Sequence, residues 1–155
     1  MTDQEANRLI LDKLPGRTSD LFGRFAIGDE MASRDAGVEA VLTGIKTATS
    51  SLTSDFLEGR LPFVGALSVL EDGCGRGRAI VETIEVELKA FGDVSASFVR
   101  AYGEGDGTHE WFRGHIGDWY KKRDKSFSDE TIVVCERFRV AVVLDLMKSE
   151  RPQIG

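Results

Sequence analysis

The sequence predicts an α+β fold: a small, mostly antiparallel β-barrel flanked by helices. Three observations favour this class. Helical patterns lie early and in the middle of the chain, short strand patterns fill the rest, and the regular β–α alternation of a doubly wound sheet is missing. At 155 residues, with 41% hydrophobic and 30% charged residues, the chain fits one globular domain. We expect a helical extension at residues 1–20, the main domain at 21–147 and a tail at 148–155.

Two helices are expected before the first long strand. Thr2 and Glu5 have the spacing of a capping box, in which a hydroxyl and a carboxylate bond the free amides at a helix start. They predict a short first helix. Asp29 is the expected N-cap of a second helix over residues 30–43, and Gly44 is a natural C-terminal stop.

The stretch after this glycine carries one lysine and a run of hydroxyl residues, and it alternates as a strand. Its two faces are Lys46, Ala48 and Ser50 on one side, and Thr47, Thr49 and Ser51 on the other. In a partly desolvated pocket such a lysine becomes a low-pKa amine or an anion clamp. The alternative is an ordinary helix-to-strand junction whose lysine reaches solvent.

Further strand patterns surround one helical insertion. The strands are expected at residues 66–70, 79–89, 131–136 and about 138–146. A glycine-rich reversal joins the first two, and we interpret it as a hairpin turn rather than a phosphate cradle, because it lacks the lysine and the helix start of a P-loop.

The insertion contains the aromatic residues. Asp93 or Ser95 is expected to cap a short helix, and Thr108 starts another after an acidic glycine loop. Trp111 and His115 lie one turn apart on that second helix, where they can stack on a base. The alternative is that this aromatic stripe is core packing.

The net charge of -6, from 20 Lys and Arg against 26 Asp and Glu, does not indicate a binder of long nucleic acid. A local basic patch remains at Lys121, Lys122, Arg123 and Lys125, with solvated surface as the alternative. No apolar run is long enough to span a bilayer, and we expect a cytoplasmic protein without a membrane partner. Cys74 and Cys135 lack zinc-ligand spacing, and neither a metal nor a cofactor is expected.

Several motifs, taken in order, resemble the ASCH domain over about residues 25–144. They are Gly44-x-Lys46-x-x-Thr49, Phe91-x-Asp93-Val94, Glu104-Gly105-Asp106, Trp111, His115 and Val134-Cys135-Glu136-x-Phe138. The early Phe25-x-x-Gly28-Asp29 is similar to the longer bacterial branch of predicted RNA-binding proteins. The resemblance implies a PUA-like β-barrel whose partner is RNA, a nucleotide or a nucleoside.

The resemblance also implies site residues. Relatives that act as amidohydrolases on acetylcytidine use a lysine, a threonine three residues later and a glutamate before a helix; these match Lys46, Thr49 and Glu104. The preferred function is RNA or nucleotide binding in a cleft that contains these three. The alternative is a small hydrolase, either a ribonuclease or an acetylcytidine amidohydrolase. Further candidates for contacting the ligand are Thr47, Ser51, Asp106, Trp111 and His115.

As chemistry, the amine of Lys46 would take a proton from Thr49 or from water. Strand alternation opposes this arrangement, since it places the two on opposite faces unless a bulge at Ala48 intervenes. Glu104 would raise the pKa of Lys46 while desolvation lowers it. One alternative is a Lys46–Glu104 salt bridge that ties the insertion to the barrel. Another is a magnesium ion held through water by Glu104 and Asp106.

Overall fold

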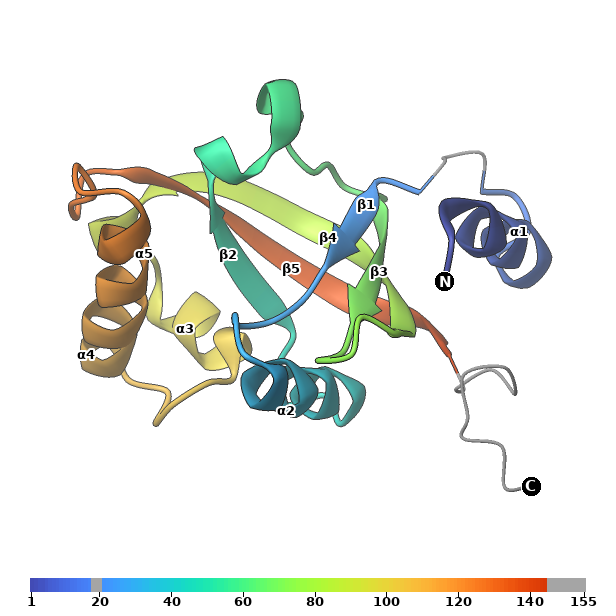
Figure 1. Ribbon diagram of the computed structural model, residues 1–155. Coiled ribbons are helices and arrows are strands. Elements are labelled where there is room, and N and C mark those ends of the chain that lie inside the picture. Colours follow the sequence, from blue (N-terminus) through green and yellow to red (C-terminus); the bar gives the residue numbers. More distant parts are fainter. Residues whose placement is uncertain (18–20, 145–155) are drawn as a thin grey trace. The chain divides into compact units, whose positions relative to one another are not determined.

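The computed structural model describes residues 1–17 and 21–144. The tail predicted at 148–155 lies outside the described residues. Contacts divide the chain into two units, whose helices and strands are labelled in Figure 1. Unit 1 consists of Met1–Thr43, Gly65–Glu82 and Arg139–Gly155, and unit 2 of Gly44–Val64 and Thr83–Phe138.

Unit 1 begins with the two predicted helices. The first, α1, spans Asp3–Lys13 and starts with the predicted capping box. The second, α2, spans Met31–Leu42. Its N-cap is Glu30 rather than the predicted Asp29, because the side chain of Ser33 accepts a hydrogen bond from the Glu30 amide and completes the cap.

The strands of unit 1 pair in both directions. The short β1 (Gly23–Phe25) runs parallel to β3 (Leu67–Glu71), and β3 is antiparallel to the first part of β4 (Gly77–Ala90). The glycine-rich reversal between β3 and β4 is a turn, as predicted. The buried Asp72 carboxylate accepts hydrogen bonds from the amides of Cys74 and Arg76. One buried apolar cluster of this unit contains Ile10, Leu67, Ile80 and Leu144.

The strands of unit 2 differ from the prediction at their ends. The strand expected from residue 46 is β2 (Ala48–Leu52), antiparallel to β5 (Ile132–Val143). It begins later because Thr47 donates its amide to the carbonyl oxygen of Ala101 in the helical insertion, while its own carbonyl accepts the amide of Phe138. The two strands predicted near the C-terminus are one continuous strand, β5.

The helical insertion of unit 2 follows β4. Ser95 caps α3 (Ala96–Tyr102), and Thr108 caps the next helical run; each side chain accepts a backbone amide three residues on. That run consists of α4 (His109–Trp111), a π-helical segment (Phe112–Ile116) and α5 (Gly117–Arg123). Three short 3-10 turns lie at Thr53–Asp55, Leu57–Gly59 and Phe91–Asp93.

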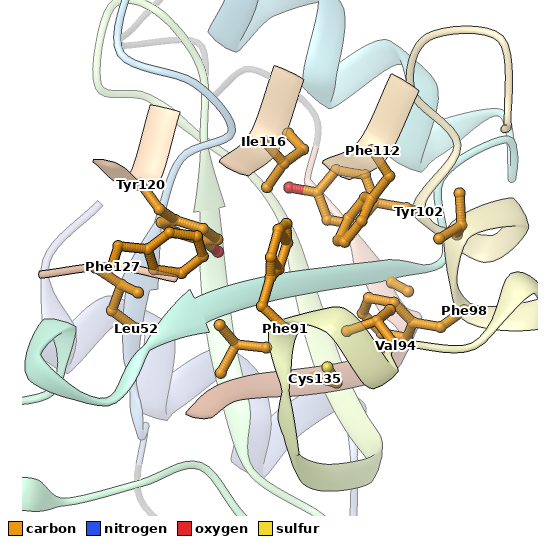
Figure 2. Packing of buried hydrophobic residues seen from close by; sticks show 13 residues of the cluster. Leu52, Phe91, Val94, Phe98, Tyr102, Phe112, Ile116, Tyr120, Phe127 and Cys135 are labelled. Atoms are coloured by element: carbon orange, nitrogen blue, oxygen red, sulfur yellow. The ribbon is translucent and has the colours of Figure 1, made fainter. Parts of the chain in front are cut away.

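The core of unit 2 is aromatic and surrounds Phe91 (Figure 2). The Phe91 ring centre lies 5.2 Å from that of Phe112, 5.0 Å from Phe127 and 6.2 Å from Tyr120. The Tyr120 hydroxyl shares a 2.7 Å hydrogen bond with Ser50 of β2. These contacts join the insertion to one face of β2 and β5, so the predicted aromatic stripe is largely core packing.

The α+β class is confirmed, with a correction to the sheet. The hydrogen-bonded order is β1-β3-β4-β5-β2, and the parallel β1–β3 pair makes the sheet mixed. The pairings of the described strands do not show closure into the predicted barrel. Within residues 1–17 and 21–144, no helix combines the length and apolar character needed to cross a membrane.

Candidate functional site

Lys46 immediately precedes β2 and is buried in unit 2. It is 1% exposed, and its Nζ lies 2.7 Å from Oε2 of Glu104. It also donates to the Tyr102 carbonyl oxygen at 2.9 Å and lies 3.4 Å from the centre of the Tyr102 ring. A lysine ammonium has three N–H donors. The Glu104 carboxylate, the Tyr102 carbonyl oxygen and the Tyr102 ring together engage all three.

Burial lowers the pKa of Lys46 from 10.5 to about 8, because the charged amine loses its hydration. The Glu104 carboxylate opposes this shift by favouring the charged form. At pH 7 the amine is still mostly protonated, so the two groups form an ion pair. The Glu104 side chain is 32% exposed, so solvent reaches the carboxylate and not the amine.

Glycine at position 103 lets the insertion approach this lysine. Gly103 is the C-cap of α3 and has φ +69°, in the left-handed region. A Cβ at this position would overlap the carbonyl oxygen of Ile45 and lie 2.8 Å from the Cα of Lys46. The close backbone contact holds residue 104 beside Lys46.

The loop beyond Glu104 packs against an aromatic pair. Gly105 has φ +63° and lies so close to the Trp111 indole that a Cβ would overlap the ring. Trp111 stacks with the exposed His115, with ring centres 4.8 Å apart and planes 13° apart. His115 belongs to the π-helical segment, a distortion that is frequent at functional sites. A partly exposed carboxylate and an exposed imidazole therefore lie on adjoining segments of unit 2.

The structure does not bring Thr49 to this pair. Thr49 is the register partner of Glu136 across β2 and β5, and directly opposed residues share a sheet face. Ala48 and Ser50 are buried on the other face. No hydrogen bond of the described structure joins Thr49 to Lys46 or Glu104, and β2 is regular at Ala48, where a bulge would be needed.

The remaining candidate residues have separate positions. Thr47 is exposed beside Lys46, and its hydroxyl lies 3.4 Å from the Ala101 carbonyl oxygen. Ser51 is half-buried opposite Val134. Asp106 is exposed and accepts hydrogen bonds from the amide and hydroxyl of Thr108, at 2.9 and 2.7 Å.

Two residues with notable positions were not expected from the sequence: Tyr102 at Lys46, and Glu136 on the face of Thr49. Tyr102 supplies both the carbonyl and the ring that hold Lys46, and no local pattern distinguishes it from other core aromatics. Glu136 lies half-buried on the face that carries Thr49, and its carboxylate accepts a 3.1 Å hydrogen bond from Thr83. A signal was present for Glu136, since it is a carboxylate within an apolar strand pattern.

Metal binding has little support in the described part of the chain. It holds no group of three or more His, Cys, Asp or Glu side chains that suits a metal ion. Asp106, considered above as a magnesium ligand, bonds to Thr108 instead. Both cysteines are free thiols, and burial raises the pKa of Cys135 to about 11.

The fold and this geometry define an α+β protein in which a buried lysine pairs with a partly exposed glutamate, and the adjoining segment carries a Trp111–His115 stack. The model of the ASCH domain matches residues 23–142, so the chain belongs to the ASCH domain family. The family resemblance drawn from the sequence is thereby confirmed.

Solved structures support the fold. The ASCH domain from Lactobacillus crispatus JV V101 aligns with a TM-score of 0.75 and 22% identity, over 89% of this chain and 95% of that one. A protein from Enterococcus faecalis V583 aligns with a TM-score of 0.78 and 23% identity, over 92% and 94% of the two chains. No curated protein matches the sequence.

Proposed function

We propose that this ASCH domain binds RNA or a nucleotide at the surface formed by Glu104, Trp111 and His115. The observation that carries the proposal is an exposed His115 ring stacked on Trp111, together with a carboxylate on the adjoining segment that a buried amine fixes. Flat aromatic faces bind unstacked bases, and carboxylates accept hydrogen bonds from base amino groups and ribose hydroxyls.

In this proposal Lys46 positions Glu104 and does not contact phosphate. Its three donors are engaged by Glu104 and Tyr102, and the amine is shielded from solvent. A phosphate ligand would need at least one free donor. The ion pair instead fixes one oxygen of Glu104 and leaves the exposed part of the carboxylate to the ligand.

Phosphate contacts are assigned to the end of the same helical run. Lys121 and Lys122 in the last turn of α5 are exposed, and neither has a salt-bridge partner among the described residues. Thr47, exposed beside Lys46, and Asp106, which shapes the loop, are the other residues proposed at this surface. Ser51 and Thr49 lie on β2 away from it.

Titration of a short mixed-sequence single-stranded RNA, followed by NMR, tests this function. His115→Ala should weaken binding roughly 5- to 150-fold, the range for losing one stacked base. Glu104→Gln should also weaken it. His109→Ala is the matched control, because the chain has one other histidine and it lies outside the stack. Unchanged affinity in His115→Ala and Glu104→Gln would exclude this surface.

A hydrolase acting on RNA or on acetylcytidine is the second candidate, and the lowered pKa of Lys46 favours it. The neutral amine would take a proton from a water that attacks the scissile bond, relayed through the partly exposed Glu104 carboxylate, and the leaving group would receive that proton. Turnover would then rise with pH through about 8, where Lys46 loses its proton.

Purified protein incubated with acetylcytidine and a short RNA, with products read by mass spectrometry, tests the second candidate. Arginine keeps the charge and cannot act as a base at these pH values, so Lys46→Arg should abolish turnover if Lys46 is the base. Turnover that survives in Lys46→Arg would refute this mechanism, and no product from the wild-type protein would leave binding as the function.

A further inference from the structure

A second polar group, the Glu136 cluster, lies on the sheet face that carries Thr49. It consists of Thr49 on β2, Thr83 on β4 and Glu136 on β5, three neighbouring strands. Thr49 and Glu136 are register partners, and the Thr83 hydroxyl donates to Oε1 of Glu136 at 3.1 Å. Thr83 is buried, whereas the other two are half-buried.

Glu136 lacks the cationic partner that two other half-buried acids of the described chain have. Glu82 pairs with Arg17 and Arg139, and Glu104 pairs with Lys46. For Glu136, no nitrogen of a described Lys, Arg or His lies within salt-bridge distance, and Thr83 supplies its one hydrogen bond. Burial raises the pKa of Glu136, as this lack of compensation requires.

The second oxygen of this carboxylate is open to a ligand. Every fully buried side-chain nitrogen or oxygen in the described residues has a hydrogen-bond partner. Oε2 of Glu136 has none there, and neither has the hydroxyl of Thr49, so both atoms reach the surface. A half-buried carboxylate next to a free hydroxyl is costly unless something binds it, because both groups have lost part of their hydration.

We propose that the Glu136 cluster binds the Watson–Crick edge of a guanine base. The carboxylate accepts the adjacent N1–H and N2–H of guanine, and the Thr49 hydroxyl donates to its O6. An arginine side chain also offers paired N–H groups, but it has no acceptor for Thr49. The acceptors of the Glu136 carboxylate and the donor of the Thr49 hydroxyl are thus complementary to the guanine edge. This site is separate from the surface of Glu104, Trp111 and His115 proposed above.

Comparison of GMP with IMP isolates this contact, because IMP differs from GMP only by lacking the N2 amino group. By calorimetry or NMR titration, GMP should bind about tenfold more tightly than IMP, the value of one hydrogen bond to a charged group. Glu136→Gln should remove this preference, since the amide presents its own N–H toward N1–H or N2–H. Glu87→Gln, a surface carboxylate paired with Lys89, is the control and should keep it.

Thermal unfolding confirms that the variants are folded, and Thr49→Val provides a second variant. It should weaken GMP and IMP equally, because both carry O6. Equal affinity for GMP and IMP in the wild-type protein would overturn the proposal. So would a preference that survives in Glu136→Gln, or binding of argininamide in place of GMP.

Discussion

Lys46→Ala should lower the free energy of unfolding by about 3 kcal/mol, as expected for emptying a buried site of this size. Lys46 is among the largest fully buried side chains of the described structure, and its removal leaves a cavity between β2 and the insertion. The Tyr102 carbonyl also loses its donor. Glu104 adds little to the loss because it is partly exposed and water replaces the amine. Chemical denaturation measures the effect.

Lys46→Met removes the charge of the buried side chain and keeps most of its volume. The difference in free energy of unfolding between the wild type and this variant should depend on pH. The folded-state pKa of Lys46 is about 8 and its ordinary value is 10.5, so between these pH values the unfolded chain holds a proton that the folded chain has lost. Wild-type stability therefore rises with pH in this window, by about 3 kcal/mol relative to Lys46→Met. Below pH 8 the difference is constant.

An exposed pair is the control for these measurements. Lys89 lies 3.2 Å from Glu87, and both side chains are well exposed. Lys89→Ala should cost less than about 1 kcal/mol, since surface ion pairs contribute little. If Lys46→Ala is no more harmful than Lys89→Ala, Lys46 is not buried as described. A wild-type curve parallel to that of Lys46→Met from pH 8 to 10.5 would rule out the lowered pKa.

Gly103→Ala should destabilise the protein by about 3 kcal/mol or more, through strain and steric overlap together. The left-handed φ of +69° alone costs an alanine about 1 kcal/mol. The new Cβ would also overlap the Ile45 carbonyl oxygen. That backbone cannot yield easily, because hydrogen bonds of Thr47 tie it to Ala101 and Phe138. Denaturant unfolding gives the loss.

Gly107 provides a control within the same loop. Its φ is +77°, but a Cβ there would meet no atom within 4 Å. Gly107→Ala should therefore show the strain alone, about 1 kcal/mol. Similar losses in both variants would mean that the insertion does not touch residue 45. A larger loss in Gly103→Ala, accompanied by altered NMR signals of Lys46, is the expected result.

The local elements were largely predictable from the sequence because their signals are local. The Thr2–Glu5 capping box, the Gly44 stop and the Ser95 and Thr108 caps each act over three or four residues, and each is observed. Two boundaries were predicted wrongly. The N-cap of α2 is Glu30 and not Asp29, and β2 begins at Ala48 and not at residue 46. In both cases a hydrogen bond to another residue, from Glu30 to Ser33 and from Thr47 to Ala101, decided the boundary.

The pairing of Lys46 with Glu104 was the salt-bridge alternative of the sequence analysis, and the structure shows that contact. Thr49 illustrates the limit of the family resemblance. The motif match suggested that Thr49 lies with Lys46 and Glu104. The alternation of β2 instead places the Thr49 side chain on the sheet face that carries Glu136. That alternation was visible in the sequence, and it was the better guide to geometry.

The sequence by itself determined the α+β class, the family and most helix caps, because periodicity, capping residues and motif order are properties of short segments. The tertiary structure alone decided which polar groups have partners. Burial and counter-charge depend on residues far apart in the chain: Tyr102 and Glu104 enclose Lys46, while no described cation reaches Glu136. Each of these side chains loses hydration on folding. Whether another group replaces the lost water sets its pKa and decides whether it is left to bind a ligand.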